Sequence, residues 1–266
     1  MKILVYGAGV LGCNLARNLF RVGKNVTLLA RGKWAEEIKK NGLRIKDKFS
    51  PRVSLSRIPV TTELKPEAPY DVIFVVMRYT QLDTIMDTLW ASKAKNIIFV
   101  GNNVRAEATA AALPEKNVLF AFASSAGHRE SDRVASVNLK KITIGQLSGA
   151  PSNEGLIGEI FSGTKYKVAY EPNIEGYRAI RNAGHTILPK EDSDFEGAAY
   201  RKTCLRFFKL LCATSLGKIC VSDHAMNAVD EMSALNRDLK RFFEENGAAY
   251  PVWRELEQEA GRYLRA

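Results

Sequence analysis

One stretch decides the fold of the N-terminal half of the chain: Lys2-Ile3-Leu4-Val5-Tyr6-Gly7-Ala8-Gly9-Val10-Leu11-Gly12. Its first five residues are a short apolar run, and residues 13–21 carry apolar side chains at helical spacing. A strand that turns through G-x-G-x-x-G into a helix is typical of a dinucleotide-binding unit. We therefore expect a cofactor to bind along the loop, at Gly7, Ala8, Gly9, Val10, Leu11 and Gly12.

Each glycine meets a physical need of such a loop. Gly7 permits the tight turn, Gly9 lets a pyrophosphate approach the backbone, and Gly12 lets the helix pack close to the strand. The pyrophosphate then lies at the positive end of the helix dipole. The pattern alone is weak evidence, but residues 25–29 follow at the right distance for the second strand of a βαβ unit. A glycine turn without a ligand is the alternative.

The end of that second strand bears on the choice of cofactor. An Asp or Glu there would bind the ribose 2′-hydroxyl and favour NAD. The chain has Ala30-Arg31-Gly32-Lys33 instead, with two cations and no carboxylate. The planar guanidinium of Arg31 matches a phosphate group, so the sequence predicts NADP(H). The alternative is that Arg31 and Lys33 are solvated loop charges.

The bulk properties of the 266 residues indicate a cytoplasmic globular protein. Hydrophobic residues make up 46% of the chain, but no apolar run could span a bilayer and no signal pattern precedes the glycine loop. The four cysteines have no metal-ligand spacing, so we expect buried thiols in a reducing compartment and no metal site. The net charge of +10 is spread along the chain without a nucleic-acid motif. We expect neither nucleic acid nor a membrane as partner.

Strands and helices alternate through residues 1–171, which predicts a doubly wound parallel sheet of the α/β class. The expected strands include 71–76, 96–100, 117–120, 141–145 and 165–170, and the expected helices include 34–40, 82–90, 106–113 and 152–160. From Ile174 onward the pattern is helical only, over about 174–184, 197–218, 222–246 and 251–264. We predict an NADP-binding Rossmann domain at 1–171 and a smaller helical domain at 172–266.

With these segments in view, the chain resembles the ketopantoate reductase family, the 2-dehydropantoate 2-reductases, over most of its length. The resemblance rests on short pieces in the family's order: Gly7-x-Gly9-x-x-Gly12, Ala30-Arg31-Gly32, Asn41-Gly42-Leu43-Arg44-Ile45, Met77-Arg78-Tyr79-Thr80-Gln81, Gly101-Asn102-Asn103 and Asp230-Glu231-Met232-x-x-Leu235. It implies a Rossmann domain followed by an all-helical domain, with the active site in the cleft between them. The implied reaction is hydride transfer from NADPH to the ketone of ketopantoate, which gives pantoate for pantothenate biosynthesis.

The same resemblance implies roles for individual residues. Arg31 falls where the family binds the 2′-phosphate. Arg78 falls where the family usually has a lysine near the nicotinamide, with Gln81 three positions on. Asn102 falls on the family asparagine that touches both cofactor and substrate; its neighbour is usually glycine and here is Asn103.

Two further positions follow from the resemblance. Ala126 falls in the loop that normally lines the cofactor, and Glu231 falls on a family glutamate that helps to hold the cofactor and the closed cleft. We therefore expect Arg78, Asn102 and Glu231 to be catalytic. The cofactor-binding residues beyond the glycine loop are expected to be Arg31, Arg78, Gln81, Asn102, Ala126 and Glu231. The alternatives are a turn residue at Asn102 and a solvated helix carboxylate at Glu231.

One departure from the family bears on mechanism. The family supplies its general acid as a lysine on the first long helix of the C-terminal domain. Here residues 166–170 resemble the strand before that helix and run straight into residues 171–177, which resemble the start of a later helix. The helix between them has no counterpart, and no lysine matches the catalytic one, although Lys167, Lys190 and Lys202 lie near the junction. A positioned acid contributes about 10²–10⁴-fold to such a reaction.

Three classes of function remain open on the sequence. The first is an NADPH-dependent reductase of ketopantoate or of another small anionic 2-keto acid. The second is a catalytically inactive NADP(H)-binding homologue. The third is an interaction protein whose helical tail forms a dimer surface, which the complete N-terminal half disfavours. The apolar residues within 205–211 also predict a homodimer, because they are too many for one stripe of a surface helix.

Overall fold

The computed structural model of the chain describes residues 1–103, 105–147, 150–171, 206, 210, 213–214, 229–245 and 247. The chain divides into two compact units, Met1–Ile174 and Glu175–Ala266. The assignment of 1–171 to NADP binding and of 172–266 to a shortened helical domain stays a prediction. Among the described residues, no helix is both long enough and apolar enough to cross a membrane.

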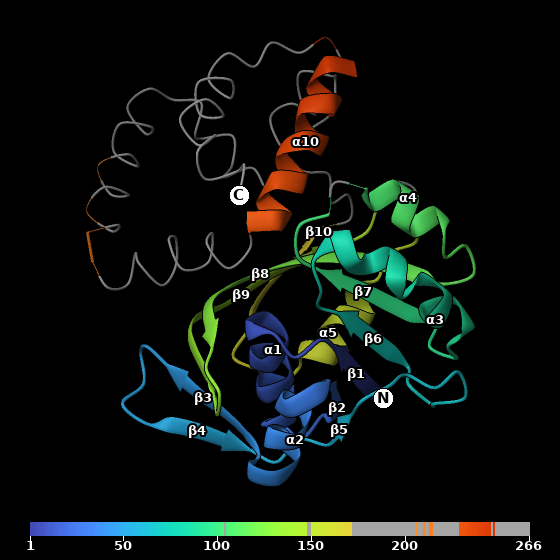
Figure 1. Ribbon diagram of the computed structural model, residues 1–266. Coiled ribbons are helices and arrows are strands. Elements are labelled where there is room, and N and C mark those ends of the chain that lie inside the picture. Colours follow the sequence, from blue (N-terminus) through green and yellow to red (C-terminus); the bar gives the residue numbers. More distant parts are fainter. Residues whose placement is uncertain are drawn as a thin grey trace. The chain divides into compact units, whose positions relative to one another are not determined.

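One mixed sheet forms the centre of the first unit (Figure 1). Its spatial order, within the described residues, is β4-β3-β9-β8-β7-β6-β1-β2-β5, and β10 pairs with β9. Neighbouring strands are parallel except in the β3–β4 and β8–β9 pairs. The strands are β1 (Lys2–Tyr6), β2 (Asn25–Leu29), β3 (Leu43–Asp47), β4 (Val53–Ser56), β5 (Val60–Thr61), β6 (Val72–Val75), β7 (Asn96–Val100), β8 (Asn117–Arg129), β9 (Val134–Gly145) and β10 (Lys167–Glu171).

The part of the sheet that runs β5-β2-β1-β6-β7-β8 has the strand order of a dinucleotide-binding fold. From β1 the chain builds outward first through β2 and then, on the other side, through β6. The topological switch point therefore lies between β1 and β6, where open α/β sheets bind ligands beside the carboxyl ends of their strands. The predicted α/β Rossmann fold is confirmed, although the sheet is not purely parallel.

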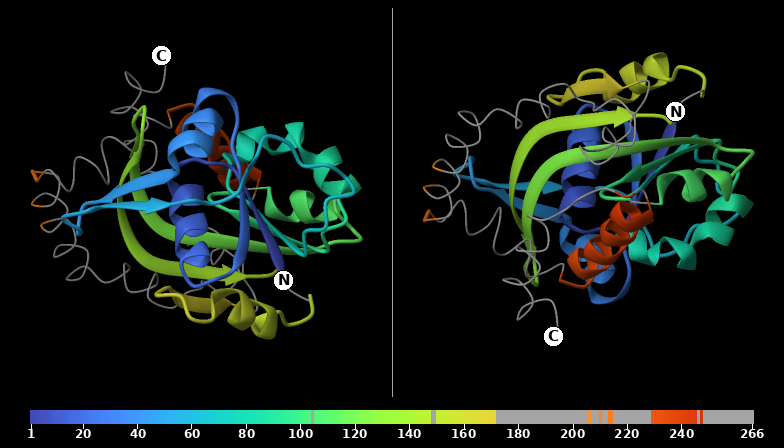
Figure 2. Two further views of the ribbon diagram at one scale, coloured as in Figure 1. Left: turned by 90° about the horizontal axis from the view of Figure 1, so that it is seen from below. Right: turned by 90° about the horizontal axis from the view of Figure 1, so that it is seen from above.

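The helices follow the strands in the alternation expected from the sequence. They are α1 (Val10–Phe20), α2 (Gly32–Asn41), the 3₁₀ helix η1 (Tyr79–Thr84), α3 (Met86–Ala91), α4 (Ala106–Ala111) and α5 (Glu154–Phe161), with α10 (Val229–Glu245) in the second unit. Helix α1 buries Cys13, Leu15, Ala16 and Leu19 and contacts β1, β2, β3, β8 and β9. Figure 2 shows the long β8–β9 pair curving past α1.

Two predicted elements differ in the structure. The helix expected at 82–90 is instead η1 followed by α3, because the backbone at Ile85 (φ −126°, ψ −2°) departs from helical geometry. The loop expected at Ala126 is wrong, since Ala126 lies inside β8 and pairs with Val137 of β9. The second half of β8 is Ser- and Ala-rich and lacks an apolar pattern of its own, so its antiparallel partner holds it extended.

In the second unit, α10 lies inside the helix predicted at 222–246 and confirms that part of it. The helices predicted at 174–184 and 251–264 lie outside the described residues. Of the helix predicted at 197–218, only Arg206, Leu210, Ala213 and Thr214 are described.

Candidate functional site

At two of the three glycine positions in the turn from β1 into α1, no residue larger than glycine fits. Gly7 has φ +121°, and a Cβ there would lie 2.2 Å from the Val76 carbonyl oxygen. A Cβ on Gly12 would lie 1.9 Å from the Gly7 carbonyl oxygen. Gly9 differs, because a Cβ there would meet nothing within 4 Å among the described residues. Gly7 and Gly12 therefore allow the backbone to pack, while Gly9 leaves space for a ligand.

The N-terminus of α1 opens into that space. Gly9 caps the helix in an extended conformation and makes no side-chain capping hydrogen bond, and no acidic residue occupies the first turn of this fully described helix. Within the described residues, its first backbone N–H groups have no side-chain acceptor, and the helix dipole places about half a positive charge there. A phosphate group suits such an end.

Two side chains hold the glycine loop from behind. Trp34 in α2 donates its indole N–H to the Ala8 carbonyl oxygen at 3.0 Å, and Cys13 Sγ donates to the same oxygen at 3.4 Å. Burial raises the pKa of Cys13 to about 12, so at neutral pH the thiol keeps its proton and remains a donor. The loop is therefore fixed before any ligand arrives. Sequence reasoning missed this role of Trp34.

Arg31 stands at the end of β2, at the position that bears on the choice of cofactor. It is exposed, occupies the capping position before α2, and has its guanidinium carbon 5.9 Å from the centre of the Tyr6 ring. Tyr6 is the last residue of β1 and is 7% exposed. The aromatic face beneath the guanidinium orients it beside the glycine loop.

The next two strands end in the remaining residues of the candidate site. Arg78 is half-buried just after β6, at the start of η1, and Gln81 is exposed within η1. Asn102 follows β7 and is exposed. Its neighbour Asn103 makes the side-chain hydrogen bonds of this turn, to Thr109 Oγ1 at 3.1 Å and from the Arg105 backbone N–H at 2.9 Å.

These contacts bear on the interpretation of Asn102 as a turn residue. The turn is held by Asn103, whereas the Asn102 amide makes no hydrogen bond within the described residues. Gly101, at φ +131°, supplies the backbone bend that leads into it. The Asn102 side chain is thus available to a ligand at this edge of the sheet.

A family model matches the part of the chain that builds this site. The model is that of ketopantoate reductase PanE/ApbA, and it matches residues 3–149, more than half of the 266. The chain belongs to the PanE/ApbA ketopantoate reductase family. It is therefore a member of a family of oxidoreductases.

Two curated relatives match parts of the chain. An uncharacterized oxidoreductase, YkpB, from Bacillus subtilis (strain 168) is 26% identical over 181 residues, which are 66% of this chain and 59% of that protein. A 2-dehydropantoate 2-reductase from Pyrococcus horikoshii is 31% identical over 98 residues, 37% of this chain and 30% of that protein. The matches thus span less than two thirds of either relative.

Solved structures share the PanE/ApbA fold with this chain. A PanE/ApbA family ketopantoate reductase from Ralstonia eutropha JMP134 aligns with a TM-score of 0.68 and 18% identity, over 99% of this chain and 98% of that one. D-mandelate dehydrogenase with NADH and anilino(oxo)acetate aligns with a TM-score of 0.70 and 16% identity, over 100% of both chains. A ketopantoate reductase from Staphylococcus aureus, described as dimeric, aligns with a TM-score of 0.59 and 15% identity, over 99% of this chain and 100% of that one.

The fold brings most of the predicted site residues to one edge of the sheet, where its parallel strands end. The glycine loop, Arg31, Arg78 and Asn102 follow the carboxyl ends of β1, β2, β6 and β7, which lie side by side in the order β2-β1-β6-β7. Ala126 is half-buried in β8, where its neighbour Ser125 accepts a hydrogen bond from Asn14 of α1 at 3.2 Å.

Glu231 belongs to the second unit and is half-buried in the first turn of α10. Lys190 and Lys202 lie outside the described residues. Lys167 is exposed at the start of β10 and lies opposite Lys141 of β9 in the parallel pair. The roles assigned to all these residues remain predictions.

Proposed function

We propose that this PanE/ApbA family member is an NADP(H)-binding oxidoreductase that acts on a small anionic 2-keto acid of the ketopantoate type. One observation carries the choice of NADP(H): Arg31 stands on the Tyr6 ring at the end of β2, next to the glycine loop. A carboxylate at this place would bind a ribose 2′-hydroxyl, whereas a guanidinium matches the 2′-phosphate.

The residues present fit a dinucleotide. Gly9 leaves open space at the uncapped N-terminus of α1, and Trp34 and Cys13 fix the Ala8 carbonyl behind it. The glycine loop would hold the pyrophosphate and Arg31 the 2′-phosphate. A bound reduced nicotinamide supplies the hydride that a ketone carbon accepts. The D-mandelate dehydrogenase that shares the fold was solved with NADH, which supports a nicotinamide cofactor here.

Arg78 and Asn102 follow β6 and β7 and are the groups we assign to the substrate end. Arg78 would stabilise the negative charge that develops on the ketone oxygen, and its positive charge also suits a carboxylate substrate. We assign Arg78 to charge stabilisation and not to proton transfer. The Asn102 amide would orient cofactor and substrate, and Glu231 would help to hold the cofactor.

The proton for the ketone oxygen has no assigned donor. Strand β10, which ends at Glu171, resembles the strand before the family's catalytic helix, and the residues that follow it in the sequence resemble the start of a later helix. This junction favours a second candidate, an NADP(H)-binding homologue with weak or no reductase activity. Reduction of another 2-keto acid is a variant of the first candidate.

An assay of NADPH oxidation with ketopantoate, run beside a cofactor-binding titration, tests the proposal. NADPH binding with measurable turnover supports the reductase and its place in pantothenate biosynthesis. NADPH binding without turnover of any small 2-keto acid supports the inactive homologue. Absence of NADPH and NADH binding would contradict both candidates.

We also propose that the protein works as a homodimer in the cytoplasm. The dimer is supported by the apolar residues within 205–211 and by the dimeric state described for the Staphylococcus aureus structure. The cytoplasm is supported by four cysteines without a pairing pattern.

A further inference from the structure

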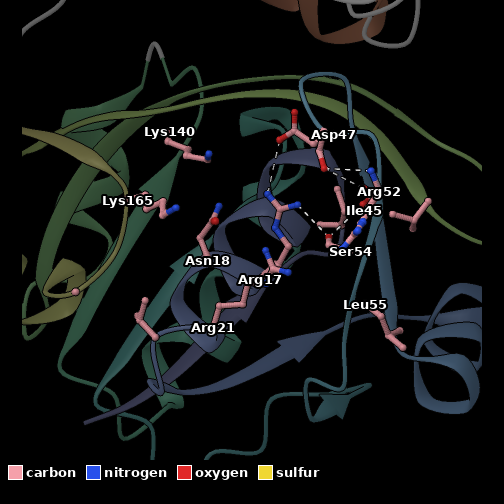
Figure 3. A pocket seen from close by; sticks show the side chains of 14 residues that line it. Arg17, Asn18, Arg21, Ile45, Asp47, Arg52, Ser54, Leu55, Lys140 and Lys165 are labelled. Atoms are coloured by element: carbon pink, nitrogen blue, oxygen red, sulfur yellow. Dashed lines mark hydrogen bonds and ion pairs between the residues drawn. The ribbon is translucent and has the colours of Figure 1, made fainter.

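A second concave site lies away from the glycine loop, at the C-terminal end of α1. Its volume is about 590 Å³, within the range of small-molecule sites. Helix α1, the β3–β4 hairpin, strand β9 and the segment before β10 line it (Figure 3). Arg17 is two turns of α1 beyond Val10, about 10 Å along the axis, so this cavity is distinct from the dinucleotide edge.

The charge of the cavity is strongly one-sided. Its walls carry five cationic side chains and one carboxylate: Arg17, Arg21, Arg52, Lys140 and Lys165, with Asp47. Cations near a helix C-terminus are favoured by the dipole, which accounts for the two on α1. The other three come from the β3–β4 hairpin, β9 and the segment before β10, so the helix dipole does not explain them.

Most of these cations have no counter-charge among the residues that the structure describes. Within the described part of the chain, neither Arg21, Arg52, Lys140 nor Lys165 forms an ion pair. Asp47 forms an ion pair with Arg17, with 4.0 Å between Oδ2 and Nη2, and its Oδ1 accepts a hydrogen bond from the Phe49 backbone N–H at 3.0 Å. In Figure 3, Lys140 and Lys165 extend from one side toward the Arg17 and Asp47 pair, and Arg52 lies on the other side.

Arg17 forms the floor of the cavity as a fixed, buried charge. It is 4% exposed, and its guanidinium donates to Ser54 Oγ at 3.2 Å and to Asn14 Oδ1 at 3.1 Å. Its Nε is buried and has no hydrogen-bond partner among the described residues. Burial lowers the pKa of Arg17, so the protein holds this charge against a desolvation cost. The floor of the cavity is thus a buried cation held in place by hydrogen bonds, which attracts an anion lying above it.

Lys140 reaches the cavity through a strained backbone. It has φ +53°, which is costly for a residue with a side chain, and its N–H is tied to Asn138 Oδ1 at 2.8 Å. The β8–β9 register shifts at this point, where Ala123 pairs with Ile142 but Ser125 pairs with Asn138. Such a bulge re-aims a side chain, and here it places a half-buried lysine in the cavity wall.

We propose that this cavity is a second ligand site, which binds a small molecule carrying two or more phosphate groups. Several cations from separate elements converge on one volume, and multiple phosphates neutralise them together more fully than a single carboxylate can. Val22, Val53 and Leu55 are exposed along the rim and would contact an organic body. The site does not depend on the activity proposed above.

Calorimetric titration of the full chain tests the site, with inorganic pyrophosphate and a sugar bisphosphate as separate probes. The variant Lys140→Gln/Lys165→Gln should bind both probes at least about tenfold more weakly than the wild type, because two charge-assisted contacts are lost. Arg52→Gln provides a single-site variant should the double variant fold poorly. Tighter binding of pyrophosphate by the wild type would indicate an inorganic ligand, and tighter binding of the sugar bisphosphate would indicate an organic one.

Two matched controls separate binding in the cavity from a general effect of net charge and from binding at the glycine loop. Lys93→Gln/Lys95→Gln removes the same charge from exposed lysines outside the cavity, and Gly9→Ala fills the space beside the glycine loop. Both should bind the probes within about twofold of the wild type. Three results would overturn the proposal. Probe affinity could fall equally in both lysine double variants, or it could fall in Gly9→Ala alone. The wild type could also fail to bind either probe at millimolar concentration.

Discussion

At the scale of single residues, Gly9 and Gly12 separate a role in binding from a role in packing. A Cβ at Gly12 collides with the Gly7 carbonyl oxygen at 1.9 Å, whereas a Cβ at Gly9 meets nothing within 4 Å among the described residues. Gly12→Ala should therefore lower the free energy of unfolding by about 1–3 kcal/mol. Gly9→Ala should keep its stability and lose NADPH affinity. Urea denaturation and a fluorescence titration measure the two effects, and equal destabilisation by both changes would contradict the assignment.

Arg31 provides the second prediction at this scale. Arg31→Asp removes the partner of the 2′-phosphate and adds repulsion, so NADPH affinity should fall by about tenfold or more while NADH affinity changes little. Lys93→Asp is the control for net charge, because Lys93 is exposed and lies between α3 and β7. Calorimetry with both cofactors is the measurement. Equal affinities of the wild type for NADPH and NADH would show that the choice of cofactor does not rest on Arg31.

The site residues also differ in how far the sequence could reveal them. Gly7, Gly9 and Gly12 were predictable because a local turn demands them, and Arg31 because it follows a strand at a fixed distance. The hydrogen bond from Trp34 to Ala8 joins residues 26 positions apart. The hydrogen bond forms only when α2 packs against the loop, so no local sequence pattern predicts that Trp34 belongs to the site.

At the scale of elements, the central strands were predictable, as were the start of β8 and the end of β9, but the rest of the β8–β9 pair was not. Strands β1 and β6 are buried on both faces, so they read as continuous apolar runs. The second half of β8 and the bulge at Lys140 depend on the register between two strands, which the cross-strand pairing sets. The cavity at the C-terminal end of α1 could not be predicted either, because its cations come from separate elements that only the tertiary fold brings together.

The pairing of β8 with β9 gives a prediction at this scale. Gly127 has φ +148°, and a Cβ there would lie 2.1 Å from the Ala135 carbonyl oxygen of β9. Gly127→Ala should lower stability by about 1–3 kcal/mol and speed amide hydrogen exchange along β8 and β9. Gly155→Ala in α5 is the matched control, because its Cβ meets nothing within 4 Å among the described residues and alanine favours a helix. Unchanged exchange in Gly127→Ala would contradict the strained contact.

At the scale of the whole molecule, the first expectation is self-association. Residues 205–211 include five apolar side chains, and Leu210, the described one among them, is 72% exposed. Buried against a second copy, this surface would hold a homodimer, so Leu210→Glu should shift the mass toward the monomer. Light scattering at micromolar concentration measures it, with Leu139→Glu on β9, at 63% exposed, as the control. A strictly monomeric wild type would contradict the dimer.

The activity of the molecule depends on a proton donor that the sequence does not supply at the family's position. The glycine loop and Arg31 should bind NADPH, while the ketone oxygen would take its proton from water or from a substitute group. We therefore expect weak or undetectable ketopantoate reduction, since loss of an acid worth about 10²–10⁴-fold removes about 3–5 kcal/mol of transition-state stabilisation. Steady-state NADPH oxidation, normalised to the bound cofactor, measures this activity.

The residual rate should then be unchanged in three variants, because none of these lysines replaces the acid: Lys167→Ala, Lys190→Ala and Lys202→Ala. Rapid turnover that one of these changes abolishes would show instead that the chain has rebuilt its acid from a lysine near the junction.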